Sequence, residues 1–389
     1  MKTILQQWRK AIYFAITIAL LVAGLVLPTA MAASAATFTV PLRGDVNLDG
    51  NIGGADVTLL RQQQAGLRTF SATQMLAADV NKDGNVSGAD VTLLRQVMAH
   101  IPGRTISDTY FIKNKQTRKF LTVGGVGGVG APVIQSTFSG STMQQWLVEF
   151  SEGVYHVRPK HNISTYLIGT SPVVLGSTSS IDNWGVEGNG DDTYSFWHIG
   201  DTCFSIMGAT GSTNVTLQLD HGTPATNEKW ELAHAGVFWV GGVANRSIAL
   251  QLANTTAQNG TWSPLIMSSC VAWNNANAGV NLYTTTTTSN YKIYVDAYYW
   301  PDDPTAAGLT TLPSNGTVYS SKVEINTNNI FFTSEYRRSV IAHEIGHMFW
   351  LGHNAPVFST GSIMKSDRDR DTLFVPQPYD AWNVRFRYD

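Results

Sequence analysis

The stretch His343-Glu-Ile-Gly-His347-Met-Phe-Trp-Leu-Gly-His353 places three imidazoles and one carboxylate close together in the chain. The run before it, from Tyr336, contains neither glycine nor proline, which predicts a helix. On a helix, His343 and His347 lie four residues apart on one face, where both side chains can bind one metal ion. Three protein ligands leave the fourth position of a zinc ion open for water, as in a catalytic rather than a structural site. The stretch therefore predicts a helix that carries a hydrolytic zinc site.

Glu344 follows the first of these histidines and is the candidate general base. A zinc ion lowers the pKa of its bound water to about 7, which makes that water a usable nucleophile at neutral pH. A carboxylate beside the metal can accept the proton of the water and pass it to a leaving amine. The expected reaction is hydrolysis of an amide bond.

Two further features extend the pattern beyond the helix. His353 follows His347 by six residues, and Met364 lies in Ser362-Ile363-Met364, while no glutamate follows Glu344. With these residues the region resembles the metzincin zinc peptidases, whose pattern is H-E-x-x-H-x-x-G-x-x-H followed by a Met-turn. The resemblance implies one zinc ion held by His343, His347 and His353, with Met364 beneath the site.

One position departs from that pattern, because Trp350 stands where the family has glycine. The glycine lets the chain leave the helix and bring the third ligand to the metal, and it adopts positive φ at little cost. A bulky residue in that conformation costs about 1–3 kcal/mol. Two alternatives follow: Gly352 supplies the bend, or His353 binds zinc less well.

A duplicated segment near the N-terminus predicts calcium binding. Residues 44–62 recur almost unchanged as residues 78–96, with oxygen-bearing side chains at the spacing of an EF-hand loop and Gly50 and Gly84 at its sharp turn. The expected ligands, in which each second asparagine contributes its backbone carbonyl, are Asp45, Asn47, Asp49, Asn51 and Asp56 in the first loop and Asp79, Asn81, Asp83, Asn85 and Asp90 in the second.

These loops end in aspartate rather than glutamate and have no entering helix, so residues 38–103 resemble a type I dockerin. The resemblance implies a small all-α module with two Ca²⁺ ions, which attaches a secreted enzyme to a cohesin domain of a cellulosome-like scaffold. The positions that dockerins use for cohesin contact are Gly54, Ala55, Gly88 and Ala89. Because the two repeats are nearly identical, either one could lead binding.

Residues 107–233 carry short β-type runs and three tryptophan motifs roughly forty residues apart, which end at Trp146, Trp184 and Trp230. The pattern is similar to ricin-type β-trefoils and implies an all-β domain with these tryptophans in a shared core. The aspartate that usually holds sugar in such lectins is replaced at the aligned positions by Thr122, Gly169 and Met207. Gln135 and Gln218 match a later polar position and are candidate sugar ligands. Carbohydrate binding and a spacer role both stay open.

Residues 237–389 have the length of a minimal metzincin domain, which would be α+β. We expect a helix beginning near Val271, with Trp273 facing the sheet, and an extended run over residues 291–299. Residues 322–326 alternate and are expected to border the cleft, where a substrate could pair with them by backbone hydrogen bonds. A C-terminal helix is expected over residues 380–388. The residues between Met364 and that helix would wall the pocket for the substrate residue after the scissile bond. Phe374 among them suggests that this pocket prefers an apolar side chain.

The composition and the N-terminal segment indicate where the protein acts. The 389 residues carry a formal charge of −2, so no basic footprint for nucleic acid is present. Lys2, Arg9 and Lys10 precede an apolar run and small residues, which predicts a signal peptide over residues 1–35 and no membrane anchor after its cleavage. The two cysteines, Cys203 and Cys270, do not make a disulfide scaffold and are expected as buried thiols.

Together these features predict a secreted, extracellular zinc endopeptidase that acts on a protein or peptide and joins a cell-surface complex through its dockerin. A second class of function is a non-catalytic carbohydrate-binding or scaffold adaptor, in which the zinc site has degenerated. A polysaccharide hydrolase is disfavoured, because no paired-carboxylate cleft is as well defined as the histidine motif.

Overall fold

The structure is a computed structural model. It describes residues 38, 40–200, 204–208, 210–219, 223–235, 237–238, 247–252, 259–285, 293–298, 300–302, 306–312, 322–327, 333–353 and 362–389. The expected signal peptide and Cys203 lie outside these residues. Cys270 is buried with a free thiol, as expected, and burial raises its pKa to about 12. None of the described helices has the length and apolar character needed to cross a membrane.

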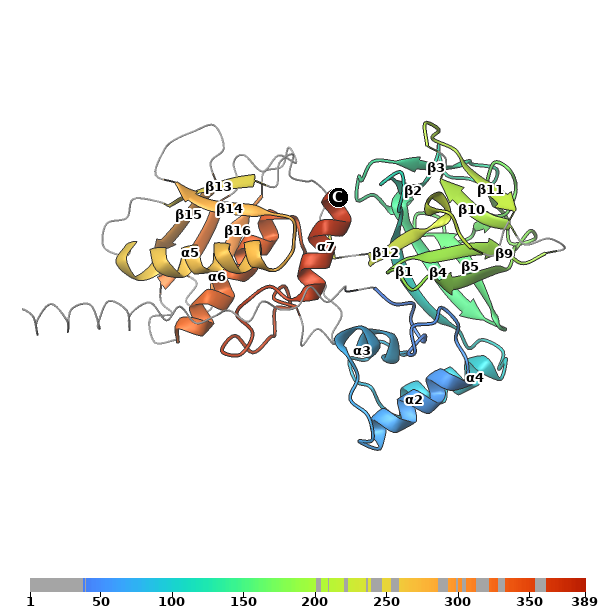
Figure 1. Cartoon of the computed structure of the whole chain (residues 1–389), viewed down its shortest axis with the longest axis horizontal. Helices are drawn as coiled ribbons and strands as arrows, with labels where there is room; N and C mark the ends of the chain where they lie inside the picture. Colours follow the sequence, from blue (N-terminus) through green and yellow to red (C-terminus); the bar gives the residue numbers. More distant parts are fainter. Residues whose placement is uncertain are drawn as a thin grey trace, which may run out of the picture. The chain divides into compact units, whose positions relative to one another are not determined.

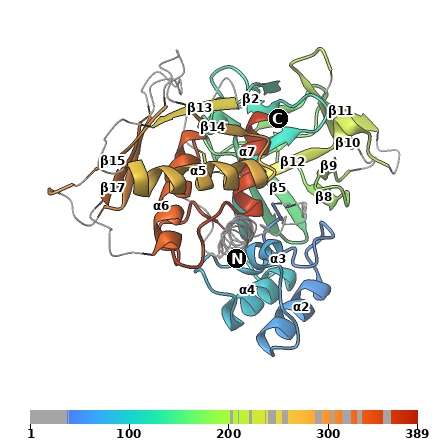
Figure 2. The same ribbon diagram turned by 60° about the vertical axis from the view of Figure 1, so that its left-hand side comes forward.

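The N-terminal module contains three described helices. They are α2 (Gly54–Gln64), α3 (Ala72–Ala78) and α4 (Gly88–Met98). Helix α4 begins where the Ser87 side chain accepts a hydrogen bond from the backbone N–H of Ala89, which caps the helix. Leu60 of α2 and Leu94 of α4 are fully buried, and Figure 2 shows the two helices side by side. The duplicated sequence therefore builds two equivalent loop–helix units around one small core.

The second region is a β-structure built from paired strands (Figure 1). Its elements are β1 (Ile106–Asn114), β2 (Phe120–Val123), β3 (Val133–Ser136), η1 (Thr142–Gln144), β4 (Gln145–Ser151), β5 (Val154–Pro159), β6 (Tyr166–Ile168), β7 (Val174–Gly176), β8 (Trp184–Gly188), β9 (Tyr194–His198), β10 (Phe204–Gly208), β11 (Val215–Leu219), η2 (Thr226–Glu228) and β12 (Trp230–His234). Of the described strands, β1, β4, β5, β8, β9 and β12 pair antiparallel in a closed ring. The pairs β2–β3, β6–β7 and β10–β11 are hairpins. A closed barrel with three hairpins is the architecture of a β-trefoil.

The three motif tryptophans fix the internal repeat of this barrel. Trp146, Trp184 and Trp230 are at most 1% exposed and stand at the start of β4, β8 and β12. Their indole N–H groups donate to backbone carbonyls of β2, β6 and β10, at 2.9, 3.1 and 3.0 Å. Each tryptophan thus ties one barrel strand to one hairpin. The predicted structural role of these residues agrees with this geometry.

Replacing Trp146 with phenylalanine should lower the free energy of unfolding of the trefoil by about 2–4 kcal/mol. The change leaves the buried Leu121 carbonyl without its donor and opens a cavity beside it. The measurement is urea denaturation followed by fluorescence. Trp197→Phe, at a half-buried position of the same barrel, is the matched control and should cost less. An equal decrease in the free energy of unfolding for both variants would contradict a special structural role of Trp146.

The third region joins a five-stranded sheet to helices. The sheet order of the described strands is β14 (Asn281–Thr285), β13 (Ser247–Leu252), β15 (Ile293–Tyr298), β17 (Lys322–Asn326) and β16 (Gly308–Thr311). All neighbours are parallel except β16, which runs antiparallel to β17. Helices α5 (Asn259–Asn275) and α6 (Ser334–Met348) pack together against the sheet, and α7 (Pro378–Tyr388) ends the chain (Figure 1).

Three expectations for this region change in detail. Strand β17 does not border an edge, because it pairs with β15 on one side and β16 on the other. Among the described strands, β16 is the edge strand next to β17, and β14 lies at the opposite edge. Val271 and Trp273 lie near the end of α5 rather than at its start, and the Trp273 indole donates to the Ala342 carbonyl of α6 at 2.9 Å. The C-terminal helix begins two residues earlier than expected, at Pro378.

Candidate metal centre

The three predicted histidines converge on one point. The Nε2 atoms of His343, His347 and His353 lie 3.0–3.1 Å from one another. Among the described residues, these three histidines form a group whose side chains could hold one metal ion. A zinc ion about 2.0–2.1 Å from each nitrogen fits this spacing. Burial lowers the pKa of His347 to about 4 and lowers those of the other two, which favours the neutral imidazoles that bind metals.

Backbone carbonyls orient two of these rings. The Nδ1–H of His343 donates to the carbonyl of Ile363, and that of His347 donates to the carbonyl of Leu351, both at 2.7 Å. A proton on Nδ1 leaves the Nε2 lone pair free for a metal, the outer-shell arrangement that fixes a ligand's tautomer. His343 and His347 come from α6, as the four-residue spacing predicted.

The chain leaves α6 through a bend at Trp350, which has φ of 60°. The Trp350 N–H donates to the His347 carbonyl and the Leu351 N–H to the Gly346 carbonyl, the bonding of a Schellman motif. Trp350 occupies the left-handed position where this motif usually has glycine. Gly352 is not among the described glycines with positive φ, so it does not supply the bend. Trp350 makes the bend itself, and His353 reaches the other two histidines.

The segment around Met364 lies under the helix. Met364 is buried, and a Cβ on Gly346 would collide with its sulfur, so a larger residue at that point of α6 would force the Met364 side chain to shift. Asp380 of α7 accepts hydrogen bonds from the Ser362 hydroxyl at 2.5 Å and from the Ile363 N–H at 2.8 Å. Because the Ile363 carbonyl orients His343, α7 supports the first histidine through this turn.

Glu344 points toward the edge strand β16. The Thr310 hydroxyl lies 2.8 Å from its Oε2 atom and 2.9 Å from its backbone carbonyl. Burial raises the pKa of Glu344 to about 7, while the Thr310 hydroxyl works in the opposite direction. A Cβ on Gly308 would come within 2.8 Å of the Glu344 side chain, so glycine there allows the strand to pass close to the carboxylate.

Both calcium loops have the same internal bonding. In the first loop, Asp56 accepts from the N–H groups of Val46 and Asn47 at 2.7 and 3.0 Å. In the second loop, Asp90 accepts from the corresponding Val80 and Asn81 at 2.8 and 3.1 Å. Asp56 and Asp90, which close the two loops, are buried. Burial also raises the pKa of Asp45, the first ligand of the first loop, to about 7, and the negative charges of Asp56 and Asp49 raise it further. Such a cluster of like charges fits a divalent cation bound by oxygen ligands.

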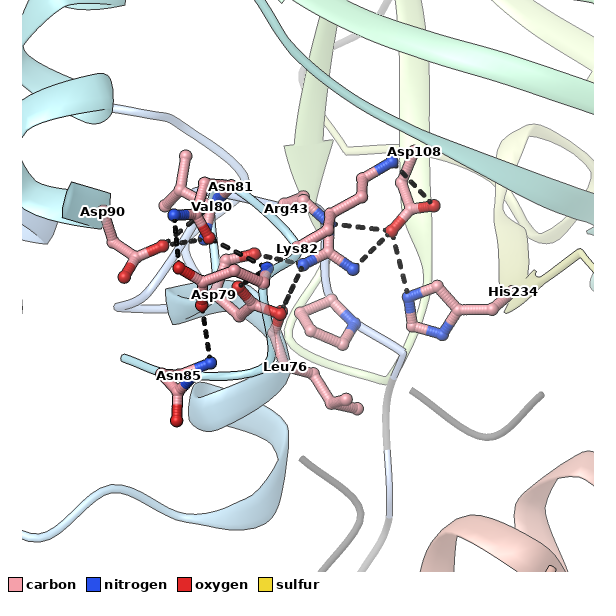
Figure 3. Close-up of polar contacts among 12 residues, drawn as sticks. Arg43, Leu76, Asp79, Val80, Asn81, Lys82, Asn85, Asp90, Asp108 and His234 are labelled. Carbon is pink, nitrogen blue, oxygen red and sulfur yellow. Dashed lines mark hydrogen bonds and ion pairs between the residues drawn. The ribbon is translucent and has the colours of Figure 1, made fainter. Parts of the chain in front are cut away.

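The second loop has a neighbour that the first lacks among the described residues. Arg43 lies 3.8 Å from the Asp79 carboxylate and 2.6 Å from that of Asp108 in β1, as Figure 3 shows. Lys82 and His234 also approach Asp108, at 3.4 and 3.7 Å. Burial raises the pKa of Asp108, but His234, Arg43 and Lys82 outweigh it and hold the pKa at about 2. Arg43 thus joins the second calcium loop to the trefoil.

The four residues expected at the cohesin contact are exposed at the starts of α2 and α4. Gly54 also lines a groove between these helices, together with Arg61 and Arg95. The sugar-binding candidates are placed differently. Gln135 is 1% exposed, and its side chain accepts a hydrogen bond from Thr117 at 2.5 Å, which is a structural position. Gln218 belongs to β11, and its side chain lies outside the described part.

Comparison with known proteins identifies two of the modules. Residues 43–98 match the model of the dockerin type I domain, and residues 100–168 match that of the ricin-type beta-trefoil lectin domain-like family. The chain therefore contains a type I dockerin and a ricin-type β-trefoil. A comparison with curated proteins gives no match.

Solved structures resemble part of the chain. The designed three-fold symmetric protein ThreeFoil has 21% identity and a TM-score of 0.28, and the match covers 32% of this chain and 97% of that one. A ricin B-like lectin of Macrolepiota procera, solved with lactose, has 16% identity and a TM-score of 0.28, covering 33% and 95%. The Rhizoctonia solani agglutinin has 16% identity and a TM-score of 0.29, covering 33% and 95%. The trefoil assignment rests on the family model and the tryptophan geometry.

Several residues at the metal centre could not be found from the sequence. Thr310 and Asp380 are ordinary residue types in segments without a motif. Arg368 is buried and donates to the Ser339 carbonyl of α6 at 2.8 Å, so it ties the segment after Met364 to the helix. From the sequence, each of these residues could be noticed only as a polar side chain in the region expected to surround the metal site.

Proposed function

We propose that this chain is a secreted zinc endopeptidase, carried by its dockerin on a cohesin-bearing scaffold. The observation that supports the peptidase most directly is the convergence of His343, His347 and His353, with Glu344 on the same helix. A zinc ion bound there would polarise the scissile carbonyl and lower the pKa of water. Glu344, oriented by Thr310, would accept the proton and pass it to the leaving amine.

The edge strand β16 is the proposed binding strand for the substrate backbone. Among the described strands it pairs with β17 alone, and Leu309 is 51% exposed. An extended peptide could add to this edge by backbone hydrogen bonds, which would carry its scissile bond past Glu344. This assignment replaces β17, which the sequence favoured.

The dockerin and trefoil support the rest of the proposal. A type I dockerin implies two calcium ions, an extracellular location and a cohesin partner, and a ricin-type lectin domain implies carbohydrate binding. The buried position of Gln135 argues against that residue as a sugar ligand. A glycan array with the full chain would separate a lectin from a spacer.

The deciding experiment combines metal analysis with proteolysis. Purified full-length protein should contain one tightly bound zinc ion and should digest casein, and a chelator should stop digestion until zinc is restored. The adaptor alternative predicts cohesin binding with neither zinc nor digestion. Protein that lacks zinc while its dockerin still binds calcium would support the adaptor function.

The duplicated dockerin gives a separate expectation. The single variant Ala55→Arg should weaken cohesin binding by only about two-fold, because the equivalent surface of the second repeat can still dock. The double variant Ala55→Arg with Ala89→Arg should lose binding. Calorimetry with a cohesin domain measures both. Loss of binding in one single variant alone would show that only one orientation is used.

A further inference from the structure

The bend at Trp350 lacks its usual glycine, so other residues must hold it. Two side chains of α7 contact the carbonyls at the end of α6. The Arg387 guanidinium donates to the Trp350 carbonyl at 3.2 Å, and the Tyr388 hydroxyl donates to the Phe349 carbonyl at 3.0 Å. A cation at the C-terminal end of a helix also meets the negative end of its dipole. Arg387 is therefore placed to stabilise the bend in its left-handed conformation.

Arg387 is itself held by aromatic rings, one of which belongs to the trefoil. Its guanidinium carbon lies 4.6 Å from the ring centre of Phe138 and 5.5 Å from that of Phe238, and the residue is 5% exposed. Phe138 lies between β3 and η1 of the trefoil. A guanidinium over aromatic faces gains cation–π energy, more so where water is excluded.

The neighbouring residue of α7 is anchored to the trefoil as well. Lys113 of β1 donates to the Phe386 carbonyl at 2.6 Å, and the Phe386 ring meets Phe120 of β2 edge to face at 5.6 Å. Both trefoil residues are buried. The trefoil therefore fixes the end of α7 that carries Arg387.

The bend controls two of the three candidate ligands. The Leu351 carbonyl, one residue after Trp350, accepts the Nδ1–H of His347 at 2.7 Å. His353 follows two residues later and reaches His343 and His347 at 3.0 Å. A shift of the Trp350 backbone would therefore displace His353 and release the outer-shell bond of His347 together.

We infer that Arg387 is a positioning residue for the zinc centre, and that the trefoil, through Phe138, is a structural part of that centre rather than a detachable module. This inference rests on the proposed zinc site. In this chain Arg387 of α7, which packs against the trefoil, stabilises the bend that glycine allows in the metzincin pattern.

The test measures zinc affinity of the full-length protein by competition with a chelating dye. Arg387→Ala should weaken zinc binding by about 10–100-fold, as loss of outer-shell partners does. Phe138→Ala should weaken it in the same direction by a smaller factor. Arg385→Ala, two residues away on the half-exposed side of α7, is the matched control and should leave zinc affinity unchanged.

A rescue experiment separates positioning from general stability. Trp350→Gly lets the backbone adopt φ of 60° without support, because glycine reaches this region at little cost. In the Trp350→Gly background, Arg387→Ala should change zinc affinity by less than about three-fold. The two side chains would then be coupled through the bend, which a purely structural role of Arg387 does not predict.

The outcomes are distinguishable. If wild-type protein binds no zinc, the proposed function fails before the inference is tested. If wild-type protein binds zinc and Arg387→Ala binds it equally well, the inference is overturned. It is also overturned if Trp350→Gly gives no rescue. Should Arg387→Ala fail to fold, judged by circular dichroism, Phe138→Ala and the double variant with Trp350→Gly decide the matter.

Discussion

Glu344→Ala should fold, bind zinc and cut no protein substrate. Removing a positioned general base typically costs about 10²–10⁴ in rate. Glu344 is not one of the three converging nitrogen ligands, so zinc affinity should stay close to that of the wild type. The measurement pairs zinc content with the rate of casein digestion at neutral pH. Retained proteolysis in a zinc-loaded Glu344→Ala protein would falsify the mechanism.

Two further variants sharpen that result. Glu344→Gln keeps the shape of the side chain and its contact with Thr310 but cannot accept a proton, so it should be as inactive as the alanine variant. Thr310→Val removes the hydroxyl that orients the carboxylate and should lower kcat by a smaller factor, with zinc content unchanged. A Gln variant with near wild-type activity would mean that Glu344 acts through packing alone.

The parts of this chain that could be predicted from sequence are those with local or repeated patterns. The spacing of His343 and His347 on a helix follows from the helical period. The calcium loops and the three core tryptophans were recognisable because each occurs more than once with the same spacing. In each case the residues needed for the prediction lie within one short segment.

Features that depend on distant segments were missed. Whether Trp350 could take the place of glycine was undecidable from the sequence, because the side chain that supports it, Arg387, lies in another helix. The edge position of β16 depends on strand order, which the alternating pattern of residues 322–326 does not encode. The sequence pattern places Gln135 at a binding surface, yet the fold buries it and Thr117 donates a hydrogen bond to its side chain.

Removing calcium should unfold the dockerin and abolish cohesin binding while the trefoil stays folded. In each loop, buried carboxylates face one another, so a bound cation offsets both repulsion and burial. A ligand at 1,000 times its dissociation constant contributes about 4 kcal/mol to stability, which is most of what a module of this size has. Circular dichroism should therefore lose helical signal on chelation and regain it with calcium, whereas the tryptophan-based signal of the trefoil should persist.

The two loops should release calcium in a fixed order, the second before the first. Arg43 places a positive charge 3.8 Å from Asp79, while Asp45 has carboxylates as the charged neighbours that act on it. Since Asp108 partly neutralises Arg43, we expect a difference in affinity of about ten-fold rather than the larger value of an isolated charge. Arg43→Met should tighten the weaker site, and Asp108→Asn should weaken it further. Calorimetric titration that gives two equal sites in the wild type, or the same shift for both variants, would contradict this control of the second loop by Arg43.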